Sequence, residues 1–469
     1  MAAHFTYAQI LAVTRGALIQ PGRTDQFAGV ATDSRTIQAG ELFIPLKGER
    51  HDGHEFIPKA LERGARGVLI EEGFVVAGLK PATTPLPPEI TVIAVPDTLT
   101  ALGDLAAAWR ARFRIPVVAV TGSCGKTTTK EMLALVLSRT YRVLKNPLNL
   151  NNLIGLPQTL LELDGVHEAA VVEMGMNRFG EIARLTQICR PTIGVLTNVH
   201  PAHTEGVGCV EGVARAKGEL KENLAADATL IYNADDVRLE ALARDFKGAA
   251  LGFGFGRRAE LQAHDRRLLG DLGQTAQVHF QGRSWPLTLK VAGLHQLYNA
   301  LAAWAVGLSL HLPPEDIAAA LAEFAPVVGR SQVLPLPGGA NLLNDVYNAN
   351  PGSMAMALHT LAELKNQGRA AAALGDMLEL GQGAAQAHWD LGRAAAQAGV
   401  ELLVIYGNHR LDVAAGAREE GLSEACIRPV ESHAEGARAL KAFLQPGDWL
   451  LVKGSRSTRM ERLVAALAG

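Results

Sequence analysis

The chain has 469 residues, more than one hydrophobic core normally holds, which predicts roughly two to four domains. Its 45 basic and 47 acidic side chains nearly cancel to a net charge of −2, so we expect no nucleic-acid partner and no anionic-membrane surface. No apolar run approaches the roughly 18 residues of a membrane span, and residues 1–18 lack the pattern of a secretory signal. The four cysteines show neither a C-x-x-C pair nor zinc-like spacing. We therefore expect a cytoplasmic protein.

Short apolar runs separated by turns open the chain. The runs at 41–46, 67–70 and 91–95 predict strands. After Pro96 the segment TLTALGDLAAAWRARF places Leu99, Leu102, Leu105 and Trp109 on one helical face. We expect this helix to begin the second domain, so that the first domain comprises residues 1–96.

The second domain, expected over 97–325, shows the pattern of a parallel α/β sheet. Its runs at 117–120, 169–172 and 193–196 are apolar without alternation, which is typical of strands covered on both faces by helices. The helical segment KEMLALVLSR follows the first of them. Near the end of the domain, QTAQVHF and SWPLTLKV alternate and predict a hairpin.

A third, smaller α/β domain is expected over residues 326–469. Its apolar runs, NLLN, AAAL, LLVIY and WLLV, are separated by alanine-rich helical stretches. The predicted fold is therefore α/β with three domains, the central one built on a parallel sheet with a phosphate-binding loop.

That loop is the segment VVAVTGSCGKTTTKEM, in which an apolar strand leads through two glycines into a helix. Backbone N–H groups and a helix N-terminus bind phosphate oxygens, a lysine reaches the outer phosphates, and a threonine hydroxyl helps to hold Mg²⁺. The usual first glycine is Val120 here, and the alternative is a glycine turn that arose by chance. The residues predicted to bind the nucleotide phosphates are Gly122, Ser123, Cys124, Gly125, Lys126, Thr127 and Thr128.

Two candidate metal ligands follow the two other predicted strands of this domain. Glu173 comes directly after the run at 169–172, and His203 follows the run at 193–196. Ligands in open α/β sheets gather beyond the carboxyl ends of the strands, so both side chains point to a metal near the phosphates. Each residue alone has an ordinary alternative, a structural ion pair for Glu173 and a hydrogen-bonded loop histidine for His203.

Lys217 lies on the apolar stripe of a predicted helix, with Val213 and Leu220 at spacings of four and three. It could pack its stem while the ammonium reaches water. Alternatively, desolvation could lower its pKa and leave a neutral amine that captures CO₂ as a carbamate, a two-oxygen metal ligand. The periodicity leaves both interpretations open.

Further polar residues cluster on loops and one helix face. Each cluster alone could be a turn or a helix cap. Only the clusters taken together support a functional site. The clusters are Asn149, Asn151 and Asn152; His295 and Asn299; Gly329 and Arg330; Asp345, Tyr347, Asn348 and Asn350; and Lys453, Ser455 and Arg456.

Taken in order, these segments resemble the motif set of the Mur ligase family. The motifs are TGSCGKTTTKEM, NLNNLIGLPQTLLEL, VVEMGMNRFGEI, TNVHPAHTEGVG, ARAKGEL, YNALAA, DVYNANPGSM, LGDMLELG and VKGSRSTRME, preceded by ATDSRTIQAGELFIPLKGERHDGHEF. The resemblance covers nearly the whole chain. It implies an ATP-dependent amide ligase with a UDP-substrate domain, a central ATPase domain and a C-terminal domain.

The resemblance also implies roles for single residues. Lys126 and Thr127 would bind ATP phosphates and Mg²⁺, and Arg330 would reach the γ-phosphate. Magnesium, as two ions, would be ligated by Thr127, Glu173, His203 and a carbamylated Lys217. The expected catalytic residues are therefore two metal ligands, His203 and Lys217, and two phosphate-binding residues, Lys126 and Arg330. Asn299 would contact adenine and Asp345 the ribose, although Gln296 replaces the first asparagine of the family's adenine-side pair. The residues expected to face the UDP-linked substrate are Ser34, Arg35, Lys47, Asn149, Asn151, Asn152, Tyr347, Asn348 and Asn350.

Within the family, the motifs are most similar to those of the branch that joins D-alanyl-D-alanine to UDP-N-acetylmuramoyl-tripeptide, and we expect a monomer. Three alternatives stand beside this expectation: a sibling ligase such as a folylpolyglutamate synthase, a P-loop kinase or ATPase, and a catalytically silent binding module. The sequence leaves open whether the third residue of the peptide is meso-diaminopimelate or L-lysine.

Overall fold

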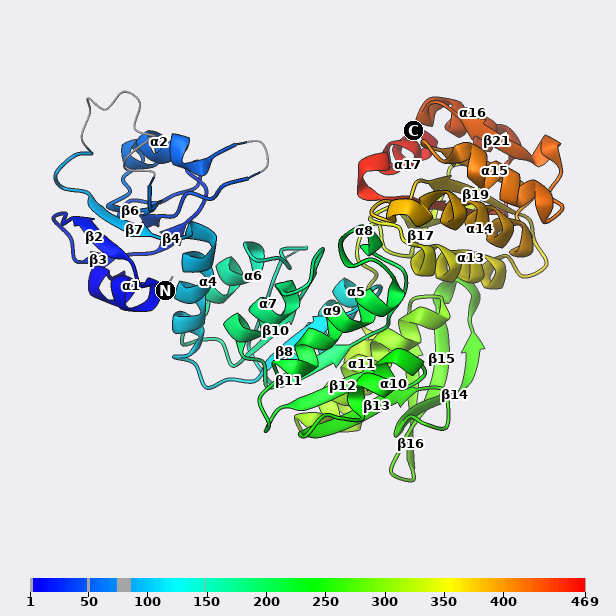
Figure 1. Cartoon of the computed structure of the whole chain (residues 1–469). Helices are drawn as coiled ribbons and strands as arrows, with labels where there is room; N and C mark the ends of the chain where they lie inside the picture. Colours follow the sequence, from blue (N-terminus) through cyan, green and yellow to red (C-terminus); the bar gives the residue numbers. More distant parts are fainter. Residues whose placement is uncertain (1–2, 49–50, 74–85, 148, 469) are drawn as a thin grey trace. The chain divides into compact units, whose positions relative to one another are not determined.

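The computed structural model describes residues 3–48, 51–73, 86–147 and 149–468 (Figure 1). By its internal contacts the chain divides into two compact units. The first unit comprises Met1–Val118, Tyr141–Met174 and Ala183–Pro191, and the second comprises the remaining segments from Ala119 to Gly469. Both units are α/β, as predicted. The three-domain division at 96/97 and 325/326 stays a prediction. No helix of the described ranges is long and apolar enough to cross a membrane.

A five-stranded sheet forms the beginning of the first unit. Its strands lie in the order β2 (Ala17–Gln20), β7 (Thr91–Val95), β6 (Gly67–Glu71), β5 (Leu42–Phe43) and β4 (Val30–Ala31). β2 pairs antiparallel with β7, and the other pairs are parallel. A separate antiparallel pair joins β1 (Phe5–Thr6) to β3 (Gln26–Phe27). The strands predicted within 41–46 and at 67–70 and 91–95 are therefore confirmed.

Helix α4 (Thr98–Arg110) is the helix predicted after Pro96. Asp97 caps it, because its carboxylate accepts a hydrogen bond from the Thr100 amide at 2.6 Å. Leu102, Leu105 and Trp109 of the predicted apolar face are buried. The other elements of this unit are α1 (Tyr7–Thr14), α2 (Ile57–Glu62), β9 (Val143–Lys145), α6 (Gly155–Leu161), β10 (Ala169–Glu173) and most of α7 (Glu181–Cys189).

The second unit begins with the last three residues of β8 (Val117–Thr121), next to β11 (Ile193–Leu196). From β11 the sheet continues through β12 (Thr229–Asn233), β13 (Ala249–Gly254), β14 (Leu261–Leu268), β15 (Gln274–Phe280) and β16 (Arg283–Leu289). β11 to β14 are parallel, and β15 and β16 form the predicted antiparallel hairpin. The helices in this part are α5 (Lys126–Leu137), α8 (Thr204–Val207), α9 (Val210–Glu222), α10 (Val237–Ala243), α11 (Leu294–Ser309) and α12 (Pro314–Ala322).

A six-stranded sheet fills the C-terminal part of the second unit, coloured yellow to red in Figure 1. Its order is β17 (Gln332–Pro335), β18 (Asn341–Asp345), β22 (Trp449–Lys453), β19 (Ala370–Gly375), β20 (Leu402–Tyr406) and β21 (Ile427–Val430), with only β17 antiparallel. The four predicted apolar runs are β18, β19, β20 and β22. The helices are α13 (Pro351–Lys365), α14 (Ala384–Gln397), α15 (Arg410–Glu419), α16 (His433–Phe443) and α17 (Glu461–Ala468).

The continuous apolar runs of this sheet have a physical reason. Leu343 and Leu374 belong to a core cluster with residues of α13, α14 and α15, whereas Leu342 and Ala373 belong to a second cluster with α16 and α17. Successive side chains of a strand point to opposite faces, so a strand covered by helices on both faces is apolar at every position.

Candidate functional site

The predicted phosphate loop lies between β8 and α5, as the sequence indicated. Gly125 precedes the first turn of α5 with a φ of 80°, in the left-handed region. A Cβ atom at this position would lie 2.3 Å from Oδ1 of Asn299. Position 125 therefore requires glycine for both its backbone conformation and its close approach to α11.

Asn198, the second residue after β11, holds the phosphate loop in place. The amide of Ser123 donates to its carbonyl oxygen at 3.0 Å, and the amide of Cys124 donates to its Oδ1 atom at 2.8 Å. The Ser123 hydroxyl donates to the carbonyl of His200 at 2.9 Å. Sequence reasoning missed Asn198 and His200, although both lie in the TNVHPAH motif that it singled out for His203.

Lys126 lies over the loop that precedes it. Its Nζ atom donates to the carbonyl oxygen of Gly122 at 2.9 Å. Thr127 and Thr128, in the first turn of α5, are 4% and 6% exposed. Since the helix N-terminus carries a partial positive charge, the lysine and the helix together favour an anion at this loop.

Lys217 is 2% exposed and lies on the inner face of α9, as its spacing predicted. Burial, first, and the positive charge of Lys126, second, lower the pKa of this amine well below its ordinary value. A neutral amine is the form that reacts with CO₂. The chemistry of this position therefore fits the carbamate interpretation, and it argues against an ammonium that reaches water.

Glu173 ends β10 in the first unit and is 2% exposed. Its Oε1 atom accepts a hydrogen bond from Nδ2 of Asn151 at 2.7 Å, and its backbone amide donates to Asn146 at 2.9 Å. The structure thus brings together two predicted site residues, Glu173 and Asn151. Asn152 instead stabilises the turn that leads into α6, since its Oδ1 atom accepts from the amides of Ile154 and Gly155 at 3.1 and 2.9 Å. Asn149 lies in the preceding turn, where its carbonyl accepts from the Asn151 amide.

His203 directly precedes α8 with a φ of 57°, and its Nδ1 atom contacts the carboxylate of Glu379. The hydrogen bond lowers the pKa of Glu379. Glu379 belongs to the LGDMLELG motif and was not predicted as a site residue. This contact engages one ring nitrogen of His203, so the other nitrogen is the one that a ligand could use.

Helix α11 carries the predicted adenine-side residues. Asn299 is buried and its Oδ1 atom accepts from the hydroxyl of Thr129, in α5, at 3.2 Å. Its Nδ2 atom donates to Oε1 of Gln296 at 3.2 Å, so the glutamine that departs from the family pattern is a partner of Asn299. His295, one turn earlier, faces Ser331 at 3.3 Å, and burial lowers its pKa to about 4.

Arg330 and Tyr347 lie face to face. The guanidinium carbon of Arg330 is 4.0 Å from the centre of the Tyr347 ring. Nearby, Asp345 accepts from the Ser331 amide at 3.0 Å and from Lys453 Nζ at 2.6 Å, and Lys453 also donates to the carbonyl of Asn348. Four of the residues predicted in this region, Arg330, Asp345, Tyr347 and Asn348, therefore form one contiguous group.

Asn350 connects the C-terminal sheet to the phosphate loop. It caps α13, and its Oδ1 atom also accepts from the Cys124 thiol at 3.2 Å. Burial raises the pKa of this thiol. Cys124 is therefore a buried, protonated contact residue and a poor nucleophile.

The three residues predicted to face uridine lie in the first unit with different partners. Arg35 pairs with Asp33 at 2.7 Å, Lys47 pairs with Glu71, and Ser34 is buried. Within the described part of the chain, no hydrogen bond or ion pair joins Lys47 to Ser34 or Arg35.

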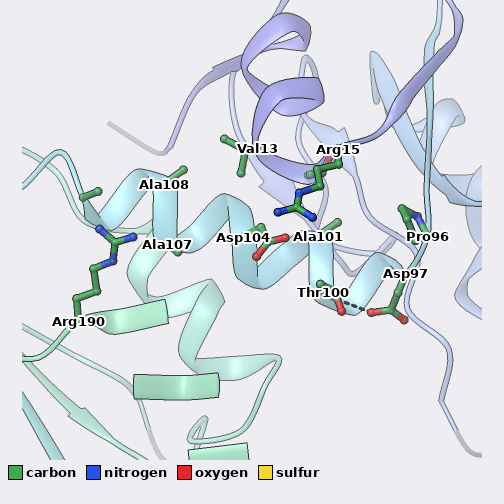
Figure 2. A pocket seen from close by; sticks show the side chains of 12 residues that line it. Val13, Arg15, Pro96, Asp97, Thr100, Ala101, Asp104, Ala107, Ala108 and Arg190 are labelled. Carbon is green, nitrogen blue, oxygen red and sulfur yellow. Dashed lines mark hydrogen bonds between the residues drawn. The ribbon is translucent and has the colours of Figure 1, made fainter. Parts of the chain in front are cut away.

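A cavity of about 510 Å³ lies elsewhere in the first unit, along α4. Figure 2 shows Arg15 beside Asp104 at one part of it and Arg190 near Ala107 and Ala108 at another. Its lining includes none of the predicted site residues.

The donor set fits magnesium chemically. Mg²⁺ prefers oxygen ligands and is usually bound by one or two carboxylates together with substrate phosphates and water. Thr127 supplies a buried hydroxyl beside the phosphate loop of the second unit, and Glu173 supplies a buried carboxylate at the end of β10 in the first unit. Among the described residues, no three His, Cys, Asp or Glu side chains cluster as a ready-made metal cage. Such a cage is not what a phosphate-bound magnesium requires.

Comparison with known proteins agrees with this architecture. Three family models match in order: the catalytic domain model of the Mur ligase family over residues 26–110, the Mur ligase middle domain over 120–307, and the glutamate ligase domain over 329–456. UDP-N-acetylmuramoyl-tripeptide–D-alanyl-D-alanine ligase of Bacillus subtilis is 35% identical over 98% of both chains. The enzyme of the same name from Escherichia coli is 34% identical over 98% of both chains.

Solved structures show the same relationship. MurF from Acinetobacter baumannii superimposes with a TM-score of 0.89 at 32% identity, covering 100% of this chain and 99% of the other. MurF ligase from Thermotoga maritima, in complex with ADP, gives a TM-score of 0.82 at 28% identity over 94% of this chain and 96% of the other. The chain belongs to the Mur ligase family.

Proposed function

We propose that this chain uses ATP to join D-alanyl-D-alanine to UDP-N-acetylmuramoyl-tripeptide in the synthesis of peptidoglycan precursors. The observation that carries the proposal is the glycine loop at Gly122–Gly125, with Lys126 folded over it, in a chain that matches ligases of this name from end to end. The loop accounts for the nucleotide, and the full-length match supports the two substrates.

The reaction must first activate a carboxylate, because oxide is too poor a leaving group for an amine to displace at neutral pH. A carboxylate oxygen of the tripeptide attacks the γ-phosphorus of ATP, the bond to the β-phosphate oxygen breaks, and ADP leaves. The free amine of D-alanyl-D-alanine then attacks the acyl phosphate. The tetrahedral adduct loses phosphate and a proton, and the amide bond remains. Phosphoryl transfer of this kind needs mainly in-line positioning and neutralisation of charge.

The chain's own residues supply both requirements. Lys126 would contact the β- and γ-phosphates, and Arg330 would contact the γ-phosphate as it is transferred. Asn299 and Asp345 would position adenine and ribose. Arg330 lies in the segment that joins the central and C-terminal parts of the second unit, so closure of the C-terminal part would complete the site and exclude water from the acyl phosphate.

Magnesium, bound as two ions, would neutralise the negative charge of the phosphates during transfer. We propose Thr127, Glu173, His203 and a carbamylated Lys217 as its protein ligands. Support for the carbamate comes from the burial and the lowered pKa of Lys217.

The substrate residues follow the same proposal. Ser34, Arg35 and Lys47 would bind the uridine nucleotide, and Asn149, Asn151 and Asn152, with Tyr347, Asn348 and Asn350, would face the peptide end. The proposal assigns UDP-substrate binding to residues 1–96, ATP binding to 97–325 and closure to 326–469. It places the enzyme in the cytoplasm, where ATP is available, as a monomer.

An acceptor panel tests this function. The chain is incubated with ATP, Mg²⁺ and UDP-N-acetylmuramoyl-tripeptide, carrying either meso-diaminopimelate or L-lysine, and with D-alanyl-D-alanine, D-alanine, L-alanine or glutamate. We expect mass spectrometry to find a UDP-pentapeptide with the dipeptide only. Product with a single amino acid would favour a sibling ligase, and nucleotide turnover without any amide would favour a kinase or ATPase.

A further inference from the structure

The ring of Tyr347 lies against the guanidinium of Arg330, in the segment where the central and C-terminal parts of the second unit meet. The guanidinium carbon is 4.0 Å from the ring centre, close enough for a cation–π contact. Arg456 lies on the same ring at 5.9 Å, near the limit of such contacts. Arg330 is therefore the main partner of the ring.

Two hydrogen bonds join the chain segments that carry Arg330 and Tyr347. The Tyr347 amide donates to the carbonyl of Gly329 at 3.1 Å, and the Ser331 amide donates to the Asp345 carboxylate at 3.0 Å. The residues on either side of Arg330 are thus both hydrogen-bonded to the segment after β18 that carries Tyr347 or to the last residue of β18. This arrangement leaves the position of the ring relative to Arg330 little freedom.

The guanidinium has no other anchor in the described part of the chain. No carboxylate there pairs with Arg330, and its Nε atom is buried without a hydrogen-bond partner. Stacking occupies the flat face of a guanidinium and leaves its in-plane N–H donors available. A stacked arginine is therefore held in place and still able to donate to phosphate oxygens.

We infer that Tyr347 is a positioning residue for Arg330, whose ring holds the guanidinium so that its N–H edge meets the transferred phosphoryl group. This inference rests on the proposed role of Arg330. For Tyr347 alone, this role replaces the contact with the UDP-linked peptide that the family resemblance implies. The aromatic face of Tyr347 positions the guanidinium, and the Tyr347 hydroxyl is not needed for this role.

Three variants separate these roles. Tyr347→Leu removes the face and should lower kcat about tenfold, the equivalent of a cation–π contact of ordinary strength, with little change in the KM for UDP-tripeptide. Tyr347→Phe keeps the face and should restore kcat to within about threefold. In an Arg330→Ala background, Tyr347→Leu should have no further effect, because the group that it positions is already absent.

Phe443 offers a matched control. It stacks on Arg369 at 4.1 Å within the same sheet domain, and Arg369 directly precedes β19 at the end of the sheet opposite to Asp345. Phe443→Leu should therefore leave kcat unchanged. An equal loss in Phe443→Leu would mean that the effect of Tyr347→Leu reflects general loosening of the domain, and would overturn the inference.

The stack can also be measured without the reaction. In a sample with ¹⁵N-labelled arginine, the Hε proton of Arg330 should resonate upfield in the unmodified chain and in Tyr347→Phe, and should move downfield in Tyr347→Leu. Unchanged resonances in Tyr347→Leu would refute the stack whatever the substrate is. A raised KM for UDP-tripeptide with unchanged kcat would instead make Tyr347 a substrate contact, and equal losses in the Phe and Leu variants would assign the effect to the hydroxyl.

Discussion

Lys453 Nζ lies 2.6 Å from the carboxylate of Asp345 and 2.9 Å from the carbonyl oxygen of Asn348. The contact joins the end of β22 to the end of β18, its parallel neighbour. Lys453 is 2% exposed, so its charge depends on these oxygens for solvation. One ammonium therefore holds the strand end on which the predicted nucleotide and substrate residues lie.

Replacing Lys453 by methionine should lower the free energy of unfolding by about 3–5 kcal/mol, because it leaves a partly buried carboxylate without its partner. Urea unfolding at pH 7.5 measures the change, with exposed Lys441→Met as the control. The double variant Lys453→Met/Asp345→Asn should recover part of the loss. A loss below about 1 kcal/mol would mean that the pair behaves as a surface ion pair.

Gly125→Ala should weaken ADP binding at least about tenfold, since it combines left-handed backbone strain with a Cβ atom 2.3 Å from Asn299. Isothermal titration with Mg²⁺-ADP measures the affinity. Gly165 is the matched control, because a Cβ atom there would meet no heavy atom within 4 Å. Equal affinity of Gly125→Ala and the unmodified chain would remove the loop from the nucleotide site.

Arg330→Ala should lower kcat by about 100-fold or more at saturating substrates, because it removes charge stabilisation of the transferred phosphoryl group. Arg330→Lys should recover little, since an ammonium lacks the planar fork and its flat stacking face. Steady-state kinetics with all three substrates measure kcat for both variants. An intact kcat in Arg330→Ala would contradict the proposed mechanism.

Burial lowers the pKa of His295 to about 4 from its ordinary 6.5. Between these values the unfolded chain binds more protons than the folded chain, so His295 makes the fold less stable as the pH falls from 6.5 towards 4. At pH 5 its contribution to the loss is about 2 kcal/mol. His295→Gln should therefore lose less stability between pH 7.5 and pH 5 than the unmodified chain, measured by urea unfolding. His264 is exposed, so His264→Gln should lose as much stability over this pH range as the unmodified chain does. Equal losses of stability in the two variants would contradict the lowered pKa of His295.

Lys217→Ala should abolish most ligase activity, and added formate or acetate should restore part of it by supplying the carboxylate oxygens of the missing carbamate. Chloride at equal ionic strength is the control for a salt effect. Lys217→Arg should not be rescued, because the longer cation fills the space. Retained activity in Lys217→Ala would exclude a role for the carbamate, and loss without any rescue would count against it.

The covered strands were readable from the sequence because burial on both faces leaves a continuous apolar run, as in β8, β10 and β11. β14 was not predicted. Its residues His264, Asp265, Arg267 and Leu268 are exposed or charged, and Asp265 has a φ of 52° where the pairing with β15 shifts register. A strand with an irregular register and one exposed face loses the alternation that predicts it.

For the candidate site as well, the sequence predicted the features that depend on nearby residues and missed the contacts between residues far apart in the chain. The phosphate loop and the position of Lys217 on the apolar face of its helix were predictable, because each depends on residues within one turn or one helix face. Whether the amine itself is buried was left open by the sequence. Glu379 was not, since its contact with His203 joins residues 176 positions apart. The Asn198 contact with Cys124 spans 74 positions and depends on β8 and β11 lying side by side.

The most direct test of the central claim is the rate of phosphate release from ATP in the presence of UDP-N-acetylmuramoyl-tripeptide, with and without D-alanyl-D-alanine. A ligase that protects its acyl phosphate should release phosphate only with the dipeptide, in equal amount to the UDP-pentapeptide formed. Release at the same rate without the dipeptide would contradict the account, because it would mean that this chain turns over nucleotide without making the amide bond.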